Sequence, residues 1–216
     1  MRESRTLAVV SAGLSQPSST RLLAERITAA VVARLEQQGV DVRVESFDLR
    51  DVAHDITNNM LTGFPSPKLE GVIDAVTGAD GLIAVTPIFT TSYSGLFKSF
   101  FDILDNTALA DLPVIIAATA GTARHSLALD YAIRPMFTYL HTVVVPTAVF
   151  AASEDWGSGA DTVKTLPDRI ERAAGELAPL MLSSTRSAGS SSPVASPASL
   201  FQEFLAGESL TGESAA

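Results

Sequence analysis

The chain has 216 residues, of which 46% are hydrophobic and 18% are charged. This composition excludes disorder for most of the chain, and the length suggests one full domain with a remainder. The 24 acidic residues outnumber the 15 basic ones and give a formal net charge of −9. Such an acidic excess argues against nucleic-acid binding and against attraction to an anionic membrane.

Cysteine is absent, which excludes disulfides, thiolate nucleophiles and thiolate metal sites. No apolar run approaches the roughly 18 residues that a membrane span needs. The apolar stretch at residues 7–10 is too short for the core of a signal peptide. His54, His125 and His141 are scattered along the chain, so no metal site is predicted. We therefore expect a cytoplasmic protein without a bound metal.

The remainder of the length falls at the carboxyl end. Residues 183–200 contain eight serines, a composition that cannot bury enough apolar surface to offset its ordering entropy. We predict a folded domain over residues 1–182 and a flexible Ser/Pro-rich tail over 183–216. Within the tail, residues 200–205 form a short apolar motif that is either a chance cluster or a tethered docking segment.

Within the predicted domain, short apolar runs alternate with segments of helical periodicity, the pattern of βα units in a parallel sheet. Strands are predicted at residues 6–10, 41–47, 81–86, 113–119 and 142–150. Helices are predicted at residues 18–38, 68–78, 94–105, 125–140 and about 161–182, with a loop around Asn58 and Asn59. Pro135 is expected to kink the fourth of these helices. Five βα units favour a flavodoxin-like, doubly wound sheet of order 2-1-3-4-5 in a three-layer α/β/α fold.

In such a sheet, ligands bind beyond the carboxyl ends of the strands. The first loop there, residues 11–20, combines a glycine with several hydroxyl side chains and leads directly into a helix. Free N–H groups at a helix N-terminus favour a phosphate, although an ordinary serine N-cap would look the same. The dinucleotide motif G-x-G-x-x-G and the P-loop motif are both absent.

Two further loops leave the same edge of the predicted sheet. Residues 87–95 offer a fixed turn at Pro87 and two aromatic side chains, which suit a flat ligand or simply seal the sheet end. Residues 119–125 are mostly small, so backbone amides there can approach the edge of a ligand. The three loops together indicate a binding site more strongly than any one of them does.

The segments SAGLSQPSSTRLL, TPIFTTSYSGLFKSFFD and ATAGTARHSLALDYAIRPMF resemble the NAD(P)H-dependent FMN reductases of the flavodoxin-like superfamily. The resemblance covers about residues 4–180, with further agreement at residues 144–147 and 149–156. It is strongest to the actinobacterial branch that supplies reduced FMN to luciferase-like monooxygenases.

The resemblance implies FMN as cofactor, NAD(P)H as hydride donor, and a homodimer or homotetramer. The implied flavin-binding residues fall in the three loops: Ser11, Ser15, Gln16, Ser18, Ser19 and Thr20 at the phosphate; Pro87, Ile88, Phe89, Ser92, Tyr93 and Ser94 along the ribityl chain and ring; and Thr119, Gly121, Thr122 and Ala123 at the pyrimidine edge. One departure is that many relatives carry an arginine within the phosphate loop, whereas here the nearest base is Arg21. Arg21 lies in the following helix and is interpreted as a solvated residue rather than a phosphate ligand.

Hydride transfer from nicotinamide to flavin needs no side chain as acid or base, so no catalytic residue is predicted. The leading hypothesis is an NAD(P)H:FMN oxidoreductase that supplies reduced flavin to a two-component monooxygenase. Two alternatives remain open: a quinone or azo reductase that keeps its FMN bound, and a non-enzymatic flavodoxin-like electron carrier. A response-regulator receiver is excluded because Ser11, Ala12 and Gly13 stand where its acidic residues would be.

Overall fold

The computed structural model describes residues 4–156 and 165–186. Apolar residues run continuously through the central strands, so these strands are buried on both faces of one sheet. The sheet order is β2-β1-β3-β5-β6, with β4 paired to β3 and β7 paired to β5. The strands are β1 (Ser4–Ser11), β2 (Asp41–Asp48), β3 (Gly81–Phe89), β4 (Ser92–Tyr93), β5 (Pro113–Ala120), β6 (Val143–Val144) and β7 (Val149–Ala152). This order confirms the predicted flavodoxin-like arrangement, but the predicted number of five strands was wrong, because the described sheet has seven.

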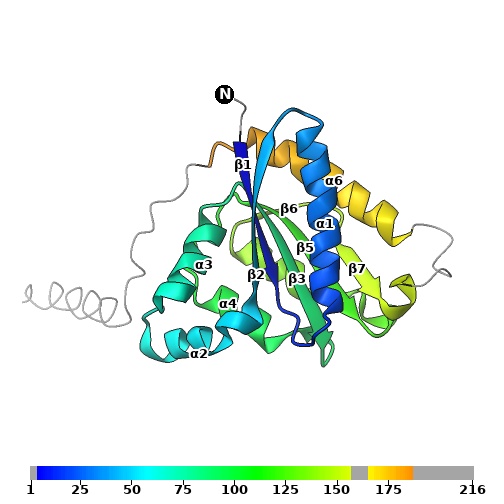
Figure 1. Cartoon of the computed structure of the whole chain (residues 1–216). Helices are drawn as coiled ribbons and strands as arrows, with labels where there is room; N and C mark the ends of the chain where they lie inside the picture. The colour runs from blue at the N-terminus through cyan, green and yellow to red at the C-terminus, as the bar shows by residue number, and fades with distance from the viewer. Residues whose placement is uncertain (1–3, 157–164, 187–216) are drawn as a thin grey trace, which may run out of the picture.

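Helices cover both faces of the sheet (Figure 1). One layer contains α1 (Ser19–Glu36) and α6 (Leu166–Ser183), whose apolar side chains pack on Leu7 and Val9 of β1. Alternate residues of the same strand, Ala8 and Val10, face the other layer. That layer contains α3 (Pro67–Thr77), α4 (Gly95–Asp102) and α5 (Arg134–Tyr139). Two separate cores therefore hold the sheet rigid between them.

The segment predicted as a loop around Asn58 is instead helical. It forms the 3₁₀ helix η1 (Leu49–Val52) followed by α2 (Ala53–Thr62). Ile56 is fully buried against the core, and Gly63 ends α2 with a φ of +78°. Asparagine has a low helix propensity, but burial of one apolar face overrides this small cost here.

Two further predicted elements are interrupted. The fifth strand divides into β6 and β7, and the connection between them contains Pro146, which has no backbone N–H to donate to a sheet ladder. The fourth helix becomes three pieces: the 3₁₀ helix η2 (Ala123–His125), the π-helix η3 (Leu129–Ile133) and α5. Pro135 lies in the first turn of α5, directly after the π-helix, so the predicted single helix is divided there, and the expected kink stays a prediction.

Among the described residues the last helix, α6, ends at Ser183, and Arg186 anchors the short segment after it. Its guanidinium donates hydrogen bonds to the carbonyl oxygens of Ala110 (2.8 Å), Ala79 (3.2 Å) and Ala108. Residues 187–216, with the apolar motif at 200–205, lie outside the described residues, so the domain boundary stays a prediction. In the described part of the chain, no helix has the length and apolar character needed to cross a membrane.

Glu176 of α6 holds the connection between β6 and β7. Its carboxylate accepts hydrogen bonds from the Thr147 backbone N–H and hydroxyl (2.7 Å each) and from Arg172 (3.1 Å). Burial alone would raise the pKa of Glu176, but these hydrogen bonds hold it below its ordinary value. The Glu176 carboxylate therefore stabilises the folded state at pH values above its unfolded-state pKa of about 4.3. This stabilisation is lost as the pH falls through the lower folded-state pKa.

We predict that Glu176→Gln lowers the free energy of unfolding at pH 7 by about 1 kcal/mol, because the acceptor charge is lost at a partly exposed site. Urea unfolding at pH 7 and below pH 4 measures the effect, which should shrink in acid. Glu171→Gln is the matched control, because Glu171 lies on the same helix in an exposed pair with Arg34. An equal loss at both pH values would contradict the role given to the Glu176 carboxylate.

Candidate active site

Three loops meet at the carboxyl edge of the sheet because β1, β3 and β5 run parallel in close register. Ser11 pairs with Val85, and Pro87 pairs with Thr119. The Ala12 backbone N–H continues the β1–β3 ladder with a hydrogen bond of 2.9 Å to the Val85 carbonyl. The three loops therefore begin close together at the carboxyl edge of the sheet.

A buried hydrogen bond ties the first loop to the third. The hydroxyls of Thr20 and Thr119 lie 2.9 Å apart, and both side chains are buried. Above this pair is a cavity of about 330 Å³ that we call the loop cavity; it is lined by Leu14, Ser15, Ser19, Thr20, Pro87, Ile88, Phe89, Thr119, Ala120, Gly121 and Ser153. Eight of the predicted flavin-binding residues are among them. None of these lining residues has a side chain that ionises in the physiological pH range.

The first loop is shaped by the capping of α1. The Ser18 hydroxyl accepts a hydrogen bond from the Arg21 backbone N–H at 3.2 Å, so this hydroxyl caps the helix. The N–H groups of Ser19 and Thr20, in the first turn, have no carbonyl partner within the helix and remain for an anion. A Cβ at Gly13 would lie only 2.1 Å from the Ser18 hydroxyl oxygen. Glycine is therefore required where the loop approaches its own cap.

Ser11 supplies one test of whether a phosphate-bearing ligand fits here. Its side chain is 2% exposed, and its hydroxyl has no hydrogen-bond partner among the described residues. A buried hydroxyl without a partner costs free energy, and such groups in native proteins call for a partner that the protein itself does not supply. The donors of this loop therefore fit a bound oxyanion such as the FMN phosphate.

The second loop is a tight hairpin. Phe89 pairs with Ser92 across it, and its tip residues Thr90 and Thr91 have positive φ values of 48° and 70°. Phe89, the last residue of β3, is 47% exposed, which leaves an aromatic surface for a flat ligand. Tyr93 instead lines a groove between α4 and α5. Ser92 lies outside the loop cavity.

Ser94 and Thr122 are occupied by local hydrogen bonds. The Ser94 hydroxyl caps α4 by accepting from the Phe97 N–H, and its own backbone N–H donates to the buried Thr86 hydroxyl at 3.0 Å. The Thr122 hydroxyl accepts from the Arg124 N–H at 3.4 Å and begins η2. Ala123 is exposed within η2. The structure thus brings the first loop, Pro87 to Phe89, Thr119 and Gly121 together, and it assigns local capping roles to Ser94 and Thr122.

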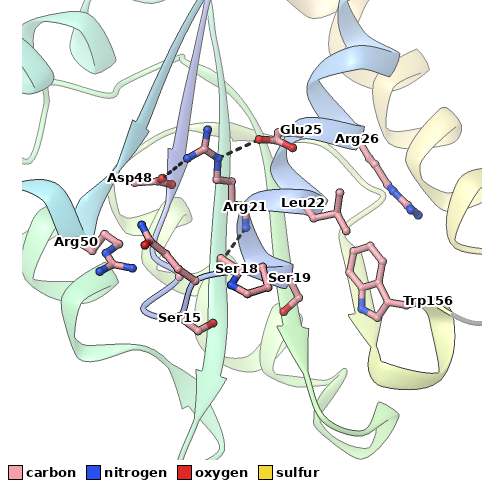
Figure 2. A pocket seen from close by; sticks show the side chains of 13 residues that line it. Ser15, Ser18, Ser19, Arg21, Leu22, Glu25, Arg26, Asp48, Arg50 and Trp156 are labelled. Atoms are coloured by element: carbon pink, nitrogen blue, oxygen red, sulfur yellow. Dashed lines mark hydrogen bonds and ion pairs between the residues drawn. The ribbon is translucent and has the colours of Figure 1, made fainter.

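A second cavity of about 770 Å³ flanks the first loop and is called the arginine cavity here (Figure 2). It shares Ser15 and Ser19 with the loop cavity and also contains Gln16 and Ser18. Its other lining residues are Gly13, Pro17, Arg21, Leu22, Glu25, Arg26, Asp48, Arg50 and Trp156. All six predicted phosphate-loop residues except Ser11 therefore line one cavity or both.

The three arginines of this cavity have different partners. Arg21 forms ion pairs with Glu25 (2.9 Å) and Asp48 (3.0 Å). The hydrogen bond that Arg21 donates to Glu25 and the charge of Asp48 raise the pKa of Arg21. Arg26 lies over the Trp156 ring, with its guanidinium carbon 5.0 Å from the ring centroid. Arg50 of η1 donates to the Leu14 carbonyl oxygen at 3.1 Å. The interpretation of Arg21 as a residue outside phosphate binding agrees with this pairing, whereas Arg50 was missed by the sequence analysis.

We predict that Gly13→Ala lowers the melting temperature and weakens FMN binding at least tenfold, because the new methyl group must displace Ser18 from its capping position. Thermal unfolding and flavin fluorescence measure the two effects. Gly71→Ala on α3 is the control: its Cβ meets no atom within 4 Å, and alanine favours a helix by about 0.5–1 kcal/mol. Normal FMN affinity in Gly13→Ala would contradict the described loop geometry.

Known proteins are similar to this chain in sequence and in fold. Residues 5–157 match the family described as NADPH-dependent FMN reductase. The chain is 36% identical over 175 residues to an FMN reductase (NADPH) of Pseudomonas aeruginosa, covering 81% of this chain and 91% of the relative. It is 35% identical over 179 residues to an NADH-dependent FMN reductase, SfnF, of Pseudomonas fluorescens, covering 82% and 93% respectively.

Solved structures agree with this relationship. An oxidoreductase from Corynebacterium diphtheriae superposes with a TM-score of 0.81 at 50% identity, covering 85% of this chain and 100% of that one. An NADH:FMN oxidoreductase in its apo form superposes with a TM-score of 0.66 at 28% identity, covering 84% and 91%. The family and the cofactors predicted from the three loop segments are thereby confirmed. The chain belongs to the NADPH-dependent FMN reductase family of oxidoreductases, whose reaction uses FMN and NAD(P)H.

Proposed function

We propose that this chain is a cytoplasmic NAD(P)H:FMN oxidoreductase that treats FMN as an exchangeable substrate and passes reduced FMN to a two-component, luciferase-like monooxygenase. The observation that carries the proposal is the loop cavity, whose eleven lining residues include no histidine, carboxylate, lysine or arginine. Such a cavity can hold and orient a flavin, but it contains no side chain suited to acid–base or nucleophilic catalysis.

Each loop has a separate binding role in this proposal. Bound FMN supplies the redox chemistry by accepting a hydride from the reduced nicotinamide. The first loop holds the phosphate with the hydroxyl of Ser15 and the N–H groups that begin α1. Pro87, Ile88 and Phe89 lie along one side of the flavin, while the small residues Thr119 and Gly121 allow backbone amides to approach its edge.

Exchange of FMN is supported by the openness of the site. Ser15, Ser19 and Gly121 are exposed, and the first loop itself contains no cation. The relatives include both NADPH-dependent and NADH-dependent FMN reductases, so either dinucleotide is a candidate donor.

The proposal is tested by anaerobic oxidation of NADH and NADPH with catalytic amounts of protein and excess FMN, FAD or riboflavin. We expect many equivalents of free FMN to be reduced for each protein chain. Activity that appears only with a quinone or an azo dye would instead support the first alternative, an enzyme that retains its flavin. No oxidation of either dinucleotide would support an electron carrier and would overturn the proposal.

We also propose that the chain forms a homodimer or homotetramer through the face formed by α4, η3 and α5. Apolar side chains are exposed there: Leu127 by 63%, Tyr131 by 79% and Tyr139 by 71%. A groove of about 480 Å³ between α4 and α5, lined in part by Phe101 and Met136, adjoins them. Large apolar side chains exposed on one part of a surface can mark an interaction site.

We predict that Tyr131→Glu shifts the chain from an oligomer to a monomer, because a charge would have to be desolvated in the contact. Sedimentation velocity measures the mass. Leu61→Glu is the control, because Leu61 on α2 is equally exposed, at 81%, but lies outside this face. An unchanged mass for Tyr131→Glu would show that the subunits meet elsewhere.

We predict that Ser18→Asp weakens FMN binding at least tenfold, because aspartate keeps the N-cap but puts a negative charge beside the phosphate. Ser66→Asp is a closely matched control: Ser66 caps α3 by accepting from the Leu69 N–H at 3.2 Å, and it lines neither of the two cavities at the first loop. Quenching of flavin fluorescence measures both dissociation constants. Equal FMN affinity in the two variants would place the phosphate away from the first loop.

A further inference from the structure

The binding site faces an electrostatic difficulty that the loop cavity alone does not resolve. The chain has a net charge of −9, and a phosphate monoester is itself anionic at neutral pH. The loop cavity offers no cation among its lining residues. A nearby positive charge would therefore strengthen phosphate binding more than another hydroxyl would.

The register of β1 and β2 brings one such charge to the first loop. Ser11, the last residue of β1, pairs with Asp48, the last residue of β2, so the chain that follows β2 starts beside the chain that follows β1. The turn of η1 then carries Arg50 to the outer side of the first loop. There its Nη1 donates to the carbonyl oxygen of Leu14 at 3.1 Å.

Arg50 differs from Arg21 in the charge of its partner, and from Arg26 in lying against the first loop itself. Two carboxylates, Glu25 and Asp48, already neutralise Arg21. Arg26 is engaged with the ring of Trp156. Arg50 bonds a neutral carbonyl, and one such bond uses only one of its five N–H donors.

The position of Arg50 also suits a ligand shared by the two cavities. Both cavities include Ser15 and Ser19, which place the start of α1 between them. Figure 2 shows Arg50 beside the first loop, with Ser15 and Ser18 along the same margin of the cavity. A phosphate held at the start of α1 would therefore border a cavity that Arg50 also lines.

We propose that Arg50 is a phosphate-binding residue that supplies, from the segment after β2, the positive charge that the first loop of this chain lacks. The ligand group is the phosphate monoester of FMN, so this inference rests on the proposed function. Arg50 also braces the loop through Leu14, which lines the loop cavity. One side chain thus positions the loop and attracts its ligand.

The test compares the dissociation constants of FMN and riboflavin, which differ only in the phosphate, for three variants of the full chain. Arg50→Gln keeps a donor for the Leu14 carbonyl but removes the charge, whereas Arg50→Lys keeps the charge. Arg43→Gln removes the same charge from an exposed residue of β2, paired with Glu45 and away from both cavities. Flavin fluorescence quenching at low and high salt gives each constant.

We expect Arg50→Gln to weaken FMN binding by about tenfold to a hundredfold, the usual contribution of a hydrogen bond to a charged group. Riboflavin binding should stay within about twofold. The salt dependence of FMN binding should become shallower, and Arg50→Lys should retain much of the wild-type affinity. Equal loss of FMN and riboflavin affinity would overturn the proposal by showing that Arg50 only braces the loop.

The dinucleotide provides a second source of a phosphate monoester. A rise in KM for NADPH without a rise for NADH, at unchanged FMN affinity, would assign Arg50 to the 2′-phosphate and overturn the FMN assignment. Wild-type protein that binds FMN but oxidises neither dinucleotide would refute the proposed function alone. Wild-type activity with no effect of Arg50→Gln on FMN binding would refute this inference alone.

Discussion

The parallel register of β1, β3 and β5 is the constraint on which the site depends. Because of this register, the three loops that follow these strands begin close together at the carboxyl edge of the sheet. There the hydroxyls of Thr20 and Thr119 form a hydrogen bond of 2.9 Å. Because both faces of these strands are buried under helices, a slip of register would expose two cores at once. The sheet therefore fixes where the three loops begin, even when no ligand is bound.

An acidic protein can bind an anionic flavin because binding is decided by local donors rather than by net charge. The N-cap at Ser18 turns the first N–H groups of α1 toward the first loop, where the helix dipole also favours an anion. Pairing of Arg21 with Glu25 and Asp48 keeps those carboxylates from facing the loop as uncompensated charges. Short-range contacts thus work against an unfavourable overall field, which salt and distance weaken.

Sequence patterns predicted the sheet because its strands are continuous apolar runs. They also indicated a candidate phosphate loop, because its residues are adjacent in the chain, and this assignment stays a prediction. They failed at residues 49–62, where asparagines suggested a loop although buried Ile56 packs the segment as a helix. They could not assign Ser94 to capping rather than flavin binding, since both uses favour serine. They missed Arg50, because its position depends on the pairing of β2 with β1 and leaves no local pattern.

A crystal structure of the protein with FMN tests the central claim most directly. The account predicts the phosphate at the N-terminus of α1, within hydrogen-bonding distance of the Ser19 and Thr20 N–H groups, and the flavin ring between the Pro87–Phe89 segment and Gly121. A flavin bound at the groove between α4 and α5, or with its phosphate away from the first loop, would contradict it.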